Sequence, residues 1–111
     1  MPHEPGPSTI IQHLGEGHHP FNSVAAPIVQ ASNFRFDSVD AYWATNDNMA
    51  GGEPYTYSRV ANPTVELAEA KIAKLEKAER CRLTGSGQGA ITLALMAELE
   101  AGGHVVAVDT C

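Results

Sequence analysis

The stretch Gly85-Ser86-Gly87-Gln88-Gly89-Ala90 decides the fold prediction for this 111-residue chain. It stands between a short, weakly strand-like segment, Arg80–Thr84, and a run of helix-forming residues, Gln88–Glu100. After Gly102-Gly103, which are expected to end that helix, Val105–Val108 is an apolar run typical of a buried parallel strand. The order of weak strand, glycine turn, helix and strand predicts a βαβ-like unit, and therefore an α/β fold.

The residues before this stretch predict helices and an arm. Asn62-Pro63 is typical of a helix start, with Asn as the N-cap and Pro at the first helical position. A helix is predicted over residues 63–78, where four apolar side chains recur at steps of three and four: Val65, Ala68, Ile72 and Leu75. Ser38 predicts an N-cap for a short helix. Residues 1–25, rich in Pro, Gly and His, are expected to form an extended arm.

Composition excludes several classes of protein. The net charge of −6, with seven basic residues that form no run, argues against nucleic-acid binding. No stretch approaches the roughly 18 apolar residues that span a bilayer, and residues 1–7 do not resemble a signal peptide. Two cysteines indicate a reducing, cytoplasmic setting. The N-terminal histidines match no closed metal motif, so we predict no metal site at His3, His13, His18 and His19.

The glycine turn is a candidate anion site. At a helix N-terminus the unpaired backbone N–H groups and the positive end of the helix dipole face the same point, and phosphate is a common ligand there. Glycine lets the backbone approach closely, and Ser86 can add a hydroxyl. The alternative interpretation is a tight turn that binds nothing.

A dinucleotide site is a second interpretation of the same turn. Gly85-x-Gly87-x-x-Ala90 fits the fingerprint G-x-G-x-x-[GA], and Asp109 follows roughly 20 residues later, where an acid would meet a ribose. Against it, Arg80–Thr84 is charged and unlike a buried first strand. It also leaves Tyr57–Thr64 without a role.

Tyr57 and Arg59 are candidates for a second phosphate contact. The guanidinium of Arg suits bidentate phosphate recognition, and a Tyr two positions away in an extended segment points to the same side. The alternative is an exposed Arg and a half-buried Tyr in a loop.

Several motifs in register resemble one family, the pyridoxal-phosphate (PLP) enzymes of Cys/Met metabolism, such as the cystathionine synthases and lyases and methionine γ-lyase. Gly52-Glu53-Pro54-Tyr55-Thr56-Tyr57-Ser58-Arg59-Val60-Ala61-Asn62-Pro63-Thr64 closely resembles their front signature. Further matches over residues 25–111 are Ser86-Gly87-Gln88-Gly89-Ala90-Ile91, Gly103-His104-Val105-Val106, Ala26-Pro27-Ile28 and Asn33-Phe34.

The resemblance implies a fold and site residues. It implies an N-terminal arm with a short helix over residues 1–60, and the beginning of the PLP-binding α/β domain of a type-I-fold enzyme over residues 61–111. Tyr57 and Arg59 would reach the cofactor phosphate of a neighbouring subunit in a homodimer or homotetramer. The main-chain N–H groups of Gly87 and Gln88, with Ser86, would bind the phosphate of their own subunit. Gln88 stands where the family has Met, which leaves a main-chain contact plausible.

The resemblance also implies β- or γ-elimination or replacement on sulfur-bearing amino acids. Lys71, Lys74 and Lys77 lie on a predicted exposed helix and do not suit the Schiff-base role, so no catalytic residue is assigned. We therefore expect the N-terminal part of a longer enzyme, inactive by itself. The alternatives are part of an NAD(P)-binding Rossmann-type oxidoreductase and a non-catalytic α/β interaction module.

Overall fold

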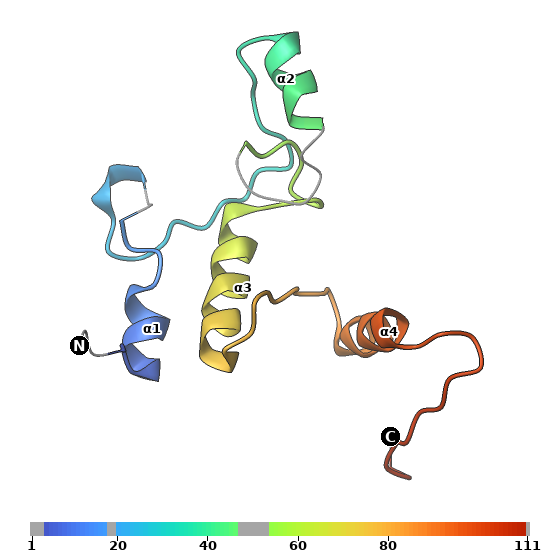
Figure 1. Cartoon of the computed structure of the whole chain (residues 1–111). Coiled ribbons are helices and arrows are strands. Elements are labelled where there is room, and N and C mark those ends of the chain that lie inside the picture. Colours follow the sequence, from blue (N-terminus) through green and yellow to red (C-terminus); the bar gives the residue numbers. More distant parts are fainter. Residues whose placement is uncertain (1–3, 18–19, 47–53, 111) are drawn as a thin grey trace. The chain divides into compact units, whose positions relative to one another are not determined.

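The computed structural model describes residues 4–17, 20–46 and 54–110. The chain divides into two compact units, Met1–Cys81 and Arg82–Cys111, and each is described by itself. The first unit holds α1 (Pro7–His13), the 3-10 helix η1 (Pro20–Asn22), α2 (Val39–Asn46) and α3 (Pro63–Glu76), and the second holds α4 (Gly87–Glu98) (Figure 1). In the described ranges no helix is both long enough and apolar enough to cross a membrane.

The described residues contain no β-strand. Their one isolated bridge is antiparallel and joins Asn33 to Tyr57. Residues 80–84 and 105–108, both predicted as strands, have no regular structure, so the prediction of a formed βαβ unit is wrong. A parallel strand exists only when a neighbouring strand satisfies its backbone groups, and no described segment pairs with either of these two.

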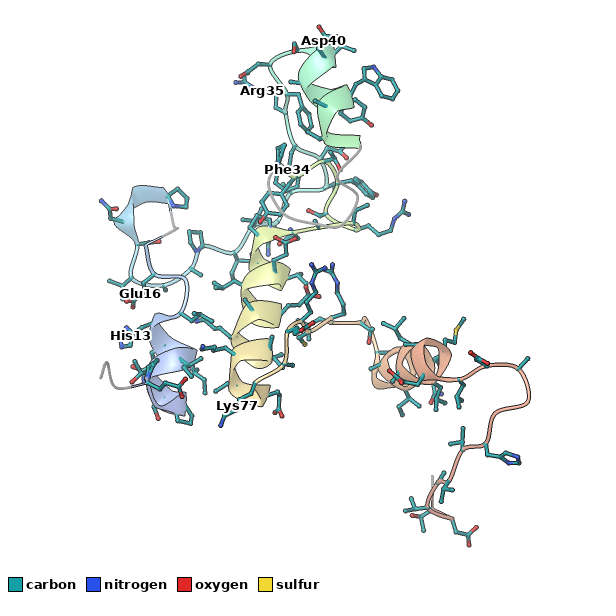
Figure 2. The ribbon with its side chains drawn as sticks, in the orientation of Figure 1. His13, Glu16, Phe34, Arg35, Asp40 and Lys77 are labelled. Carbon is teal, nitrogen blue, oxygen red and sulfur yellow. The ribbon has the colours of Figure 1, made fainter. Side chains whose placement is uncertain are left out.

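Helix α3 begins where the sequence predicts and ends slightly earlier. The Asn62 side chain accepts a hydrogen bond from the N–H of Thr64, and Pro63 occupies the first turn. The helix ends at Glu76, two residues before the predicted 78, because Lys77 adopts the left-handed conformation (φ 55°). Lys77 thus closes the last turn of α3 (Figure 2).

The face of α3 that is buried differs from the predicted apolar stripe. Val65 and Ile72 of that stripe stay exposed, whereas Glu69 and Ala73 are buried. Figure 1 shows α1 beside α3, and Lys71, the α3 side chain that donates to a carbonyl of α1, is not part of the predicted stripe.

A cluster of polar side chains attaches the start of α3 to the segment around Val29. The Asn62 amide Nδ2 donates to Val29 O (3.0 Å) and to Ser58 Oγ (2.9 Å). The Val29 N–H in turn donates to Thr64 Oγ1 at 2.9 Å. Since Asn62 is only 8% exposed, these bonds replace the water that its amide loses on folding.

Helix α1 contradicts the prediction that residues 1–25 are an extended arm. Pro7 starts it, because proline suits the first turn of a helix. Lys71 Nζ of α3 donates to Ile11 O at 2.6 Å. Past the helix, Gly15 has a φ of +90°, and a Cβ built on it would overlap Cδ1 of Leu67 in α3. A contact with α3 that sequence periodicity does not reveal therefore supports this helix.

Helix α2 confirms the N-cap predicted at Ser38. Its Oγ accepts from the Ala41 N–H at 3.1 Å, and the helix runs from Val39 to Asn46. The Tyr42 ring packs edge-on against Phe36, with 5.4 Å between the ring centroids. Residues 47–53, which follow α2, lie outside the part of the chain that the structure describes.

Replacing Asn62 by Ala is expected to expose the start of α3. An N-cap contributes about 1 kcal/mol, so exchange of the Thr64 amide hydrogen should accelerate about fivefold. The matched variant Thr64→Val removes the acceptor of the Val29 N–H but keeps the Asn62 cap. It should accelerate exchange at residue 29 while residue 64 stays protected, as measured by amide hydrogen exchange. Unchanged exchange at residue 64 in Asn62→Ala would contradict the cap.

Candidate functional site

Tyr57 and Arg59 lie on a tight turn, not on the extended segment that the sequence predicts. Residues 58–60 form the turn, because the N–H groups of Val60 and Ala61 both donate to Tyr57 O, at 2.9 and 3.1 Å. The turn nevertheless brings the two side chains together, since Arg59 Cζ lies 5.1 Å from the centroid of the Tyr57 ring. Their proximity is thus a cation–π contact across a turn.

The Tyr57–Arg59 pair is accessible. Tyr57 is 38% exposed, Arg59 is also exposed, and Arg59 makes no ion pair with any residue that the structure describes. A guanidinium stacked on a ring keeps its N–H donors at its edge, where they are available to an anion. Gly52 and Glu53, at the front of the same motif, lie outside the described residues.

The start of α4 forms the second candidate site. Ser86 is the N-cap: its Oγ accepts from the Gly89 N–H at 3.0 Å, and its carbonyl oxygen accepts from the Ala90 N–H at 3.1 Å. Thr84 Oγ1 donates to the same carbonyl oxygen at 2.7 Å and fixes the entry of the chain. This cap is a role of Ser86 that was not predicted, although a Ser before a helical run is the usual signal for one.

This cap leaves the N–H groups of Gly87 and Gln88 for another acceptor. They are the first two donors of α4, and neither has a partner among the residues described in this unit. A Cβ on Gly87 would meet nothing within 4 Å, so the space before the helix is open. The Ser86 hydroxyl accepts through a lone pair and still has its proton to donate.

The start of α4 therefore fits a phosphate. Two adjacent N–H groups and one hydroxyl lie at the positive end of the helix dipole, where they can donate to an anion, and phosphate offers several strong acceptor oxygens. The predicted residues Ser86, Gly87 and Gln88 come together here, in the unit Arg82–Cys111. Tyr57 and Arg59 come together in the unit Met1–Cys81.

Of the four N-terminal histidines, the structure describes His13. His13 Nδ1 lies 2.8 Å from Oε1 of Glu16, just past the end of α1 (Figure 2). His3, His18 and His19 lie outside the described residues.

Helix α4 ends at Glu98, before the predicted Glu100, and Gly102 follows in a turn with a φ of +89°.

Substitutions of Ser86, Gly87 and Gly89 are expected to differ in how much they weaken the N-cap of α4. Gly89→Ala places a Cβ 3.2 Å from Ser86 Oγ and should shift it slightly, whereas Ser86→Ala removes it. Ser86→Ala should accelerate exchange of the residue-89 amide about fivefold, because an N-cap contributes about 1 kcal/mol, and Gly89→Ala should accelerate it less. Gly87→Ala faces open space and is the control. Equal protection of that amide in Ser86→Ala and the unchanged protein would refute the cap.

Known proteins match the part of the chain that contains both candidate sites. The model of the family described as "Cys/Met metabolism PLP-dependent enzyme" matches residues 8–111. L-methionine gamma-lyase of Treponema denticola is 37% identical over 98 residues, which cover 88% of this chain and 24% of that protein. O-acetyl-L-homoserine sulfhydrylase of Leptospira meyeri is 35% identical over 108 residues, which cover 96% of this chain and 24% of that protein.

A solved structure shares the arrangement of the backbone. Cystathionine gamma synthase from Xanthomonas oryzae pv. oryzae, in complex with cystathionine, matches with a TM-score of 0.69 and 30% identity, over 86% of this chain and 22% of that one. The chain thus spans about a quarter of the length of the relatives that it matches.

Proposed function

Since this chain belongs to the Cys/Met metabolism PLP-dependent enzyme family, we propose that it is the N-terminal part of such an enzyme and supplies its phosphate anchor. The family predicted from the motifs is confirmed, and with it the α/β class of the type-I-fold enzymes. The observation that carries the anchor is the pair of N–H groups at Gly87 and Gln88, which have no partner among the described residues of this unit, beside the Ser86 hydroxyl.

The anchor acts mainly through the main chain. The N–H groups of Gly87 and Gln88 are fixed by the helix, so binding a phosphate through them orders no side chain. Gln88 contributes its N–H and not its amide side chain, which explains how Gln can stand where the family has Met. Ser86 donates its hydroxyl while its oxygen holds the cap.

The cofactor supplies the chemistry. When bound, PLP serves as an electron sink for carbanions at the α-carbon of amino acids. The residues of this chain bind and orient it. Lys71 Nζ donates a hydrogen bond to Ile11 O, and Lys74 and Lys77 are exposed, so none of the three has the buried surroundings of a reactive lysine. The lysine that carries the cofactor is therefore assigned to another part of the enzyme.

Tyr57 and Arg59 are proposed to bind the phosphate of a neighbouring subunit in a homodimer or homotetramer. The exposure of the pair and the absence of an ion pair to Arg59 among the described residues support this role. The guanidinium supplies charge and paired donors, and the phenol supplies a hydroxyl.

The substrate class follows from the names of the relatives. They include a methionine lyase, a homoserine sulfhydrylase and a synthase bound to cystathionine. We therefore propose an amino-acid substrate, with elimination or replacement of a sulfur-bearing side chain as the reaction. The dinucleotide site and the non-catalytic module find no support in these matches.

PLP, and not NAD, should raise the thermal stability of the protein expressed from its complete reading frame.

In that protein Gly87→Pro removes one N–H, and proline suits both the first helical position and the extended Ser86 before it. Loss of a hydrogen bond to a charged group costs about 1.5–3 kcal/mol, so PLP affinity should fall about tenfold to a hundredfold. Gln88→Ala keeps its N–H and should bind PLP normally. Equal affinity of the Gly87→Pro and Gln88→Ala proteins would argue against a main-chain anchor.

Mixed subunits test the proposed contact across the interface. An Arg59→Ala protein and a protein whose cofactor-carrying lysine is replaced are each expected to be inactive. Mixed dimers should regain activity, because one of their two sites would combine an intact lysine with an intact Arg59 from the other subunit. Mixed dimers that form, as shown by mass, but stay inactive would place Arg59 at its own subunit's cofactor or away from any.

A further inference from the structure

Ser58 lies between the two residues of the proposed phosphate contact and makes more hydrogen bonds than either. We propose that Ser58 is a positioning residue, which sets the direction in which Tyr57 and Arg59 face the phosphate. This inference rests on the proposed function of that pair.

Three hydrogen bonds hold Ser58 from the inner side of the turn. Its N–H donates to Ser32 O at 2.9 Å, and its hydroxyl donates to Ala31 O. Its Oγ also accepts from Asn62 Nδ2 at 2.9 Å. The hydroxyl therefore both donates and accepts, and it links the segment at Ala31 to the cap of α3.

The neighbours of Ser58 face the other way. Ser58 is half-buried, whereas Tyr57 and Arg59 on either side of it are exposed. The guanidinium of Arg59 also stacks on the Tyr57 ring, so the two side chains form one group. A change in the backbone at Ser58 would therefore move both phosphate contacts together.

Loss of the Ser58 hydroxyl would loosen this group without removing it. Ala31 O and Asn62 Nδ2 would each lose a partner, while the Tyr57–Arg59 contact itself would stay. A phosphate ligand would then have to order the turn as it binds, and that cost lowers affinity. The expected effect is on binding of the phosphate and not on the rest of the cofactor.

Pyridoxamine 5′-phosphate is the suitable probe, because its amine does not bond covalently to a lysine and its affinity reports the non-covalent contacts. With the cofactor-free whole protein, Ser58→Ala should bind it about tenfold more weakly. Ser32→Ala is the matched control, since it changes a serine on the facing segment but keeps the carbonyl that Ser58 contacts. Pyridoxamine, which has no phosphate, should bind equally to both variants.

A double-mutant cycle distinguishes positioning from general damage. If Ser58 acts through Arg59, Ser58→Ala should have little effect on affinity in an Arg59→Ala background. An equal effect in both backgrounds, or none beyond Ser32→Ala, would overturn the proposal. An Arg59→Ala protein of normal affinity would instead refute the phosphate role of the pair itself.

Asn62→Asp tests the same link if Ser58→Ala does not fold. Aspartate keeps the cap of α3 but removes the amide that donates to Ser58 Oγ and to Val29 O. It should weaken binding of the same probe severalfold, and this loss should also disappear in the Arg59→Ala background. A normal affinity, or a loss that persists there, would overturn the proposal.

Discussion

The buried side-chain amide of Asn62 connects three segments of the first unit. Its oxygen caps α3, and its nitrogen donates both of its protons, one to Val29 O and one to Ser58 Oγ. Each of these groups would cost about 1–3 kcal/mol if it were buried without a partner, so the three bonds depend on one another. Among the described residues only two apolar side chains are buried, those of Ala61 and Ala73. Polar hydrogen bonds, and not apolar packing, therefore hold the turn at residues 58–60 in place.

The two candidate phosphate contacts orient their hydrogen-bond donors in different ways. At α4 the donors belong to the backbone, and the helix orients them before any ligand arrives. At the Tyr57–Arg59 turn the donors belong to flexible side chains, so a stacked ring and an anchored serine are needed to orient them. The first contact tolerates changes of side chain, whereas the second depends on the identity of each residue.

Much of the local structure was predictable from particular residues. Asn62-Pro63 and Ser38 mark helix starts because capping is chemistry between near neighbours, and the glycine turn opens α4 for the same reason. The lack of strand structure at 80–84 and 105–108 was not predictable in this way, since a strand depends on partners from elsewhere in the chain. Helix α1 was missed because Lys71, sixty residues away, helps to hold it. The cluster of Ser58, Asn62 and Thr64 was missed because these residues bond to backbone groups of residues 29–32, and the side-chain pattern of a sequence does not reveal such bonds.

The close approach of Gly15 to α3 has an evolutionary consequence. Its φ of +90° disfavours every residue with a side chain, and a Cβ there would overlap Leu67. A substitution at position 15 is therefore unfavourable for two independent reasons, and a smaller residue at position 67 relieves only one of them. The two positions should drift unequally among descendants of this sequence: Leu67 can vary in size while Gly15 stays, but Gly15 can change only where the path of the chain between α1 and α3 changes with it.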